Sequence, residues 1–219
     1  MKKYIITGAA TGLGFELAKL YGKEGMIILV GRRKEELLKA AKELNSMGIE
    51  AKAISCDISN YDEVLKLKDE IKKDYGSIDY LINNAGVGCF GALGELSKTD
   101  IDKAIDINVK GTIYITQMLL PFVKERILNI ISTAGLRGKV NETVYCASKF
   151  AVRGFTEALQ KESQGKEFKV TGVYMGGMNT PFWDTSSHVK DKSRLKSPYD
   201  IAKVIKEYDD GREEIIIES

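Results

Sequence analysis

The sequence predicts an α/β fold, a Rossmann-type doubly wound parallel sheet of about seven strands with helices on both faces. Short apolar runs rich in branched residues alternate with amphipathic segments along the 219 residues. The first apolar run leads through a glycine-rich turn into a helix-like segment. Strand–helix alternation is typical of a parallel sheet covered on both sides. Length and the absence of linkers or repeats predict one domain over residues 1–219.

Residue periodicity assigns the elements in order. Apolar runs predict strands at residues 3–7, 26–30, 50–55, 79–83, 128–132, 170–174 and 214–218. Apolar residues three and four apart predict helices at 12–21, 34–47, 62–75, 100–107, 111–124 and 145–162, with Pro121 as a possible kink. Residues 180–198 follow neither period and are expected to be irregular.

The turn after the first strand reads Thr7-Gly8-Ala9-Ala10-Thr11-Gly12-Leu13-Gly14. Gly8 permits a tight turn, Gly12 lets a pyrophosphate approach the backbone, and Gly14 lets the helix pack close to the strand. Free N–H groups and the positive end of the helix dipole suit phosphate groups. The turn therefore favours dinucleotide binding, although an ordinary glycine-rich turn has the same pattern.

The end of the second strand bears on which dinucleotide is bound. NAD-binding units usually carry an acid here for the 2′-hydroxyl of the ribose. This chain has Gly31, followed by Arg32 and Arg33. No carboxylate repels a 2′-phosphate, and two guanidinium groups are suited to bind one. We therefore expect NADP, with NAD as the less favoured cofactor. The alternative is that the arginines begin the next helix as solvated charges.

Three side chains in the second half have acid–base potential. Ser132 ends a predicted strand, where ligands of a parallel sheet bind. Tyr145 and Lys149 are four residues apart and share a helix face. A phenol ordinarily titrates near pH ~10. A neighbouring ammonium group is expected to lower that pKa toward the working range of a catalyst. Without companions, such a pair is also common on exposed helix faces.

Together these motifs resemble the short-chain dehydrogenase/reductase family, in its common single-domain type. The resemblance covers residues 3–182 and, more loosely, 197 to the end. The first turn fits Thr-Gly-x-x-x-Gly-x-Gly, Asn83-Asn84-Ala85-Gly86 matches Asn-Asn-Ala-Gly, and Tyr145-x-x-x-Lys149 follows Ser132. The resemblance implies a dinucleotide-binding catalytic domain. It also implies direct hydride transfer between NADP(H) and a small-molecule carbonyl or alcohol, without a metal.

By this resemblance Asn108, Ser132, Tyr145 and Lys149 are the catalytic residues. Tyr145 is the general acid in reduction and the base in oxidation, and Ser132 hydrogen-bonds the substrate oxygen. Lys149 tunes Tyr145 and holds the nicotinamide ribose, while Asn108 positions a water that links Lys149 to solvent. The cofactor-binding residues implied are Gly8, Thr11, Gly12, Leu13, Gly14, Arg32, Arg33, Asp57, Ile58, Asn84, Ala85, Gly86, Tyr145, Lys149, Gly176 and Thr180.

Two positions depart from the family pattern. The element after the sixth strand usually begins Pro-Gly, whereas this chain has Met175-Gly176, which puts the rigidity of that loop in doubt. Many NADP-using relatives have a basic residue where this chain has Thr11, so Arg32 is expected to carry more of the cofactor discrimination.

Composition narrows the possible partners. A net charge of +2 gives no strong field for nucleic acid or anionic membrane. No run approaches ~20 apolar residues, and a strand begins almost at once, so we expect neither a spanning helix nor a signal peptide. Cys56, Cys89 and Cys146 lack pairing or metal-ligand spacing, which suggests a reducing, cytoplasmic compartment. The single histidine, His188, is expected to be a solvated loop residue.

By resemblance, residues 180–198 form the substrate lid, with Gly176 and Gly177 as a hinge. Its four cations are expected to be solvated, while Phe182 and Trp183 line or cover the pocket. The sequence does not name the substrate. A partly apolar pocket is expected from Leu136, Cys89, Phe90, Met178, Phe182 and Trp183.

The same residues bear on two other functions and on the assembly state. A non-catalytic NADP-binding regulator typically lacks the tyrosine or lysine, and both are kept here. Sugar-nucleotide epimerases resemble Gly-x-x-Gly-x-x-Gly in the first turn and have a longer carboxyl-terminal region. The predicted helices 111–124 and 145–162 resemble those that pair in dimers and tetramers, so we expect a homodimer or homotetramer. Its apolar surface would come from Thr112, Ile115, Met118, Leu119, Ala151 and Phe155.

Overall fold

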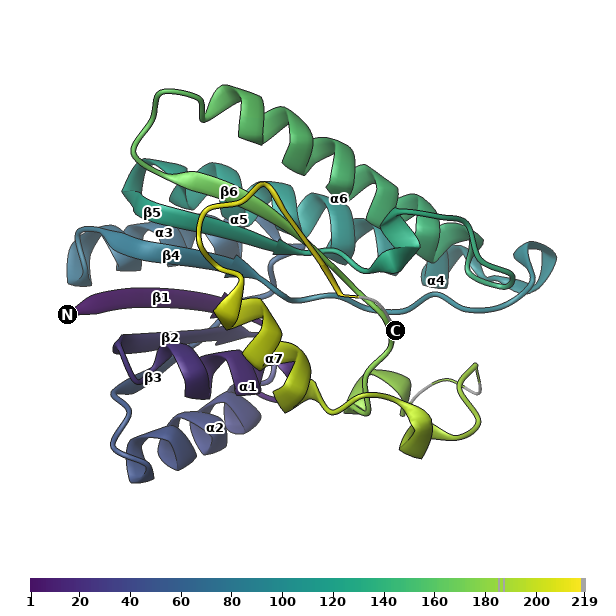
Figure 1. Cartoon of the computed structure of the whole chain (residues 1–219), viewed down its shortest axis with the longest axis horizontal. Helices are drawn as coiled ribbons and strands as arrows, with labels where there is room; N and C mark the ends of the chain where they lie inside the picture. The colour runs from purple at the N-terminus through teal and green to yellow at the C-terminus, as the bar shows by residue number, and fades with distance from the viewer. Residues whose placement is uncertain (185, 187, 218–219) are drawn as a thin grey trace.

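A computed structural model describes residues 1–184, 186 and 188–217. Seven parallel strands form one sheet in the order β3-β2-β1-β4-β5-β6-β7. They are β1 (Lys2–Thr7), β2 (Gly25–Gly31), β3 (Ala51–Ser55), β4 (Ile78–Asn83), β5 (Val123–Ile130), β6 (Lys169–Met175) and β7 (Glu214–Ile217). The chain runs outward from β1 to β3, returns across β1 to β4, and continues to β7 (Figure 1). The predicted fold class is confirmed; the last residue of the predicted seventh strand, 218, lies outside the described part.

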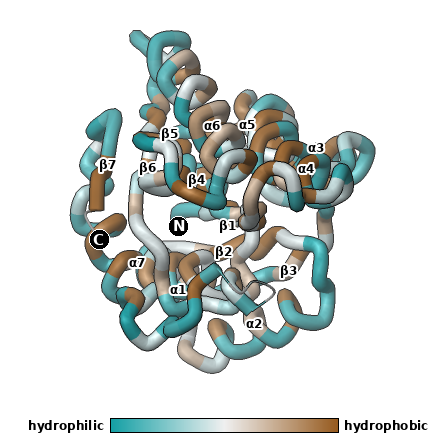
Figure 2. The backbone as a smooth tube through the Cα atoms, turned by 90° about the vertical axis from the view of Figure 1, so that its right-hand side faces the viewer, coloured by the Kyte–Doolittle hydropathy of each residue, from teal (hydrophilic) through white to brown (hydrophobic). Residues whose placement is uncertain are grey.

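Helices cover both faces of the sheet, and Figure 2 shows the two layers. One face carries α1 (Gly12–Tyr21), α2 (Lys34–Ser46) and α7 (Pro198–Glu207); the other carries α3 (Tyr61–Asp74), α4 (Lys98–Ile105), α5 (Thr112–Leu119) and α6 (Thr143–Glu162). Each layer has its own apolar core. Leu17, Leu44 and Ile205 belong to the first, and Leu67, Ile115 and Leu159 to the second. Strands buried on both faces explain the continuous apolar runs of the sequence.

The segment predicted as one helix over residues 111–124 is divided in the structure. Helix α5 ends at Leu119, a 3₁₀ turn spans Leu120–Phe122, and β5 begins at Val123. Pro121 therefore lies in the first turn of the 3₁₀ helix, where its missing N–H costs nothing, and it does not kink a longer helix. The predicted helix was too long because Phe122 and Val123 continue the apolar spacing into the strand.

Helix α7 was not predicted as an element. Its start has ordinary helix signals: the Ser197 hydroxyl accepts from the Tyr199 N–H, and Pro198 occupies the first turn. Ile201, Ala202 and Ile205 then face the first core. Apolar residues at this i, i+1, i+4 spacing after Ser-Pro indicate a helix, so α7 could have been predicted from the sequence.

In the described part of the chain, no helix combines the length and the apolar character that crossing a membrane requires.

Candidate active site

The strand order reverses direction between β1 and β4, and a cleft of about 830 Å³ opens at the carboxyl ends of these strands. Ligands of open α/β sheets bind at such switch points. Every predicted site residue lines this cleft except Gly14 and Asn108, which lie directly behind its wall. The turn after β1 forms one end, and Tyr145 and Ser132 line the other part. The sheet thus gathers side chains that are more than a hundred residues apart in sequence.

The glycine turn has the backbone that a phosphate cradle requires. Gly8 and Gly12 have φ values of 64° and 58°, which L side chains rarely adopt. A Cβ on Gly14 would lie 2.5 Å from both the Gly8 carbonyl oxygen and the Asn84 amide nitrogen. Gly14 therefore allows α1 to begin against the turn, as predicted, and the helix N-terminus faces the cleft. These residues fit a bound pyrophosphate.

Asn84 fastens this turn to β4. Its side-chain amide donates to the carbonyl oxygens of Thr7 and Gly8 at 2.9 and 3.1 Å. In return the Thr7 hydroxyl accepts from the backbone N–H groups of Asn84 and Ala85, both at 3.0 Å. Asn84 was predicted to bind cofactor, but its amide N–H groups are already used here. Its contribution in the structure is to hold the phosphate turn in shape.

The part of the cleft at the carboxyl end of β2 carries the residues that were predicted to select the cofactor. Arg32 is half-exposed, and its guanidinium lies 3.9 Å from the Asp57 carboxylate. Arg33 lies 2.9 Å from Glu36 on the same helix. A Cβ on Gly31 would meet only Leu37, at 3.6 Å, which is ordinary contact. Both arginines line the cleft; Arg33 pairs with Glu36, whereas the acidic neighbour of Arg32 is Asp57, which itself lines the cleft.

Ser132 is held in a strained backbone conformation. It is buried, and its φ of 122° with ψ of 153° lies in a region that only glycine adopts readily. Its hydroxyl accepts from the Ala134 N–H at 3.2 Å. Such strain persists where the surrounding structure fixes it, and it is frequent at functional sites. Here it directs the residue after β5 toward Tyr145.

Tyr145 and Lys149 are both buried, and burial sets their proton affinities. Burial raises the pKa of the Tyr145 phenol above its ordinary value, and the Ser132 side chain offsets this only in part. Burial also lowers the pKa of Lys149, to about 8. The Lys149 Nζ lies 5.7 Å from the centre of the tyrosine ring and donates to the Ile130 carbonyl at 3.2 Å. In the free protein burial is the largest influence on the Tyr145 pKa, so the expectation that Lys149 lowers that pKa stays a prediction.

Asn108 lies in a π-helical turn, Asp106–Gly111, between α4 and α5. Its side chain is 1 % exposed and is fully engaged. It accepts from the Val87 N–H at 2.8 Å and donates to the Val87 carbonyl at 2.9 Å and the Ser148 hydroxyl at 3.0 Å. π-turns within helices are frequent at functional sites. The side chain holds the loop after β4 against α6, which is a positioning role.

Aromatic rings enclose the part of the cleft next to Tyr145. Phe90 and Phe182 lie 5.3 and 6.1 Å from the Tyr145 ring, and Trp183 stacks on Phe90 at 5.1 Å. Cys89 and Met178 also line the cleft, as predicted. Leu136 does not, because it packs against Ile131, Val152 and Tyr174 behind the strand ends. The region is thus largely apolar, and the rings of Phe90 and Phe182 lie tilted against that of Tyr145.

The interpretation of His188 as a solvated residue is wrong. Its ring is partly buried and stacks on Phe90, with centroids 4.6 Å apart and planes 7° apart. Its Nε2 lies 3.0 Å from Oε1 of Glu142, a buried residue that lines the cleft. Sequence reasoning missed Glu142 altogether. Only its position, three residues before Tyr145, could have drawn attention to it.

Comparison with known proteins agrees with this geometry. The short chain dehydrogenase family matches residues 2–191. A sepiapterin reductase from Chlorobaculum tepidum is 33 % identical over 212 residues, which cover 90 % of this chain and 86 % of that protein.

Solved structures are similar over the same extent. An alcohol dehydrogenase from the archaeon Thermococcus sibiricus, complexed with 5-hydroxy-NADP, has a TM-score of 0.90 at 25 % identity and covers 99 % of this chain and 96 % of its own. An actinorhodin polyketide ketoreductase variant with NADPH has a TM-score of 0.86 at 30 % identity and covers 94 % and 89 %. With the family match over nearly its whole length, this chain belongs to the short-chain dehydrogenase/reductase family of oxidoreductases.

Proposed function

We propose that this protein is an NADP(H)-dependent carbonyl reductase in which Tyr145 donates the proton. The observation that carries the proposal is the placement of the Tyr145 and Ser132 side chains in the same cleft as the glycine turn after β1. A nucleotide bound along the cleft would have its phosphates at the turn and its reactive end beside these side chains. NADPH supplies the hydride when bound.

The residues of this chain would handle the proton and the oxygen. As the carbonyl carbon accepts a hydride, negative charge develops on its oxygen, and the Ser132 and Tyr145 hydroxyls are placed to donate to it. Tyr145 then transfers its proton to that oxygen, which gives the alcohol. Because burial raises the pKa of Tyr145, the phenol is protonated before the step, as a general acid requires. The buried Lys149 cation would stabilise the phenolate that remains.

NADP(H) is the cofactor we propose, because no acid stands at Gly31 and Arg32 reaches the cleft. The related alcohol dehydrogenase and ketoreductase structures hold 5-hydroxy-NADP and NADPH. The rings of Phe90, Phe182 and Trp183 favour a carbonyl attached to a flat, apolar group. A metal is not part of the proposed chemistry.

The test combines a substrate screen with one variant. Purified protein is assayed with NADPH and a panel of aromatic aldehydes and ketones, following loss of NADPH absorbance. Tyr145→Phe should reduce turnover by ~10²-fold or more while still binding NADPH. Tyr199→Phe, an exposed tyrosine on α7, is the matched control and should behave as wild type.

Two results would count against the proposal. Near wild-type turnover in Tyr145→Phe would exclude it as the proton donor. Tight NADPH binding without reduction of any panel member would favour the non-catalytic regulator on the same fold.

A further inference from the structure

The lid segment, residues 180–198 without 185 and 187, contacts the body at several places. At its base the Asn179 N–H donates to the Lys196 carbonyl at 3.0 Å, and Met178 and Lys196 form a β-bridge. The rings of Phe182 and Trp183 pack on Phe90. Farther along, His188 contacts Glu142 at the entry to α6, which adds a polar contact to this aromatic packing.

The His188 ring also contacts two aromatic rings, one in the loop after β4 and one in its own segment. The ring stacks on Phe90, from the loop after β4, at 4.6 Å. It lies nearly parallel to Trp183, from the 3₁₀ turn after β6, with centroids 6.2 Å apart and planes 19° apart. Phe90 and Trp183 stack on each other at 5.1 Å. One side chain thus links the lid segment, the β4 loop and the entry to the catalytic helix.

The acidic side chain at this contact is that of Glu142. Glu142 is buried, with its side chain 10 % exposed, and His188 Nε2 lies 3.0 Å from it. The other charged groups nearby have different partners. In the lid segment Lys192 pairs with Asp184 and Arg194 with Asp191, while Lys139, ahead of α6, donates to Thr133. Tyr145 on α6 and Asp100 and Lys103 on α4 also line the cleft.

We propose that His188 and Glu142 are positioning residues that hold the lid segment closed over the aromatic half of the cleft. Closure itself is a property of the free protein. Its effect on substrate binding rests on the proposed reductase function. Closing such a segment excludes water from the reacting groups and fixes the rings that would contact substrate.

The sequence supplies a built-in reporter, because it has one tryptophan and one histidine, and they are Trp183 and His188. Trp183 is 9 % exposed in the closed arrangement. We would measure its emission and its quenching by acrylamide in the free protein. Acrylamide quenching should be weak in wild type. His188→Gln should increase quenching, because the contact with Glu142 and the stack on Phe90 are lost.

Glu142→Ala removes the partner of His188 and should increase quenching as His188→Gln does. Glu142→Gln keeps a side chain that hydrogen-bonds the imidazole, so its quenching should stay close to wild type. Lys190→Gln, an exposed residue of the same segment, is the matched control and should be quenched like wild type. Thermal unfolding followed by far-UV circular dichroism identifies any variant that fails to fold.

A second arm measures the consequence for substrate, using 1-phenyl-1,2-propanedione as the probe. His188→Gln should raise KM by roughly 3- to 10-fold, the effect of one lost hydrogen bond, with kcat little changed. If wild type does not reduce this diketone or any other panel member, the reductase proposal fails while the quenching result still decides on closure. Identical quenching of His188→Gln and wild type would overturn the closure proposal.

Discussion

Tyr145 and Lys149 lie four residues apart on α6, and sequence spacing suggested that the cation sets the pKa of the phenol. In the structure the ammonium group is 5.7 Å from the ring centre and is directed toward the Ile130 carbonyl. Both side chains are buried among apolar neighbours, so desolvation dominates for each of them. At the scale of single residues, this pair therefore has a firmly protonated phenol and a lysine whose positive charge is destabilised by burial.

The free-energy cost of burying the Lys149 charge predicts that the stability of the folded protein depends on pH. The folded-state pKa of Lys149, about 8, lies below its unfolded value of 10.5, so the unfolded chain binds the proton more tightly. The penalty is complete below pH ~8 and disappears as pH rises toward ~10.5, and it amounts to ~3 kcal/mol. Lys149→Met should therefore unfold at a higher urea concentration than wild type at pH ~7. Its free energy of unfolding should be roughly 1–3 kcal/mol larger, once the lost hydrogen bond to Ile130 is taken into account.

The measurement is urea unfolding of both proteins without cofactor at pH ~7 and pH ~10. The difference between them should shrink at the higher pH. Lys42→Met, an exposed position on α2, should show no such trend. An equal difference at both pH values would contradict the burial argument.

Cofactor choice is also decided by single side chains. A charge-assisted contact between Arg32 and a 2′-phosphate is worth ~1.5–3 kcal/mol, so NADPH should bind about 10- to 100-fold more tightly than NADH. Arg32→Ala should remove most of this preference. Gly31→Asp should reverse it, because the site tolerates a Cβ and the new acid would bind the ribose diol and repel the phosphate.

Both reduced cofactors would be titrated by fluorescence against each variant. Lys34→Ala, the next cation along the chain and not a cleft residue, is the control. The NADPH preference should weaken as salt rises, since Arg32 is half-exposed. Asp57→Asn should tighten NADPH, because Arg32 would lose its carboxylate partner. Equal affinities for the two cofactors in wild type would end this interpretation.

At the scale of elements, apolar spacing and turn residues predicted the strands and most helices, because the spacing of apolar residues within one element is constant. The errors occur where two elements join without a glycine or another turn residue between them. The π-turn Asp106–Gly111 connects α4 to α5 without a break, and the 3₁₀ turn Leu120–Phe122 leads straight into β5. No residue type marks a π-turn, because it depends on the packing of Asn108 and Gly111 against neighbouring segments.

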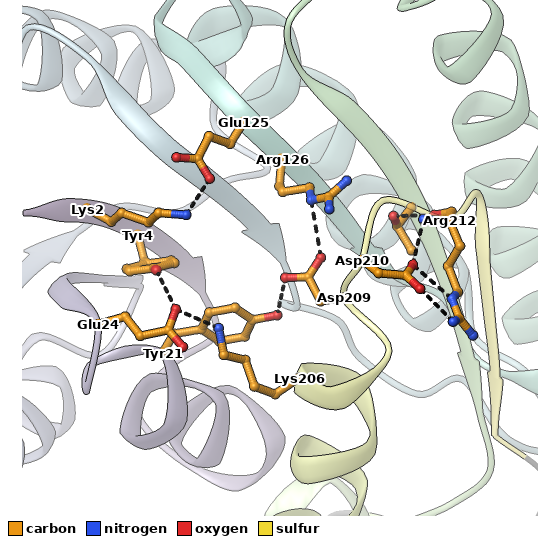
Figure 3. Close-up of polar contacts among 11 residues, drawn as sticks. Lys2, Tyr4, Tyr21, Glu24, Glu125, Arg126, Lys206, Asp209, Asp210 and Arg212 are labelled. Atoms are coloured by element: carbon orange, nitrogen blue, oxygen red, sulfur yellow. Dashed lines mark hydrogen bonds and ion pairs between the residues drawn. The ribbon is translucent and has the colours of Figure 1, made fainter.

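The connection from α7 to β7 is fastened to the amino-terminal end of the sheet, away from the cleft. Figure 3 shows Asp209 of this connection between Arg126 of β5 and Tyr21 of α1. The Tyr21 hydroxyl donates to Asp209 at 2.8 Å, and the Arg126 Nε lies 3.4 Å from the other carboxylate oxygen. The Asp209 side chain is 1 % exposed. An unpaired carboxylate would be expensive in this position.

Arg126→Met should therefore destabilise the protein by ~3–5 kcal/mol, because it leaves the Asp209 charge buried with only Tyr21 as partner. The double variant Arg126→Met/Asp209→Asn should recover part of this loss, since no buried charge remains. A double-mutant cycle by urea unfolding measures the coupling. Strict additivity of the two single changes would show that the pair is not coupled.

At the scale of the whole molecule, the topology explains why most of the candidate site could be predicted and part of it could not. The switch between β1 and β4 brings the glycine turn, Asn84 and Ser132 to one edge, and each carries a local motif. The role of His188 has no local signal. It arises only when the lid segment folds back over Phe90 and Glu142, which come from distant parts of the chain.

Half of the residues predicted to form the assembly surface are not at the surface of the subunit. Thr112, Ile115 and Leu119 are buried within the subunit, so they cannot supply a contact. The outer face of α6 remains. It has an exposed phenylalanine, Phe150, beside a row of exposed small residues three and four apart: Ala147, Ala151, Gly154 and Ala158. Small residues let a second helix approach closely, and an exposed ring supplies apolar area.

We expect the protein to be at least a homodimer that pairs through this face of α6. Nothing lies within 4 Å of a Cβ built on Gly154, so Gly154→Arg should fold normally as a subunit and yet prevent a close helix pair. Light scattering at micromolar concentration should give a multiple of 24.3 kDa for wild type and the subunit mass for Gly154→Arg. Gly94→Arg, an equally open glycine on the loop before α4, should keep the wild-type mass. A monomeric wild type would refute the assembly, and an unchanged mass in Gly154→Arg would place the contact on another face, such as the open edge at β7.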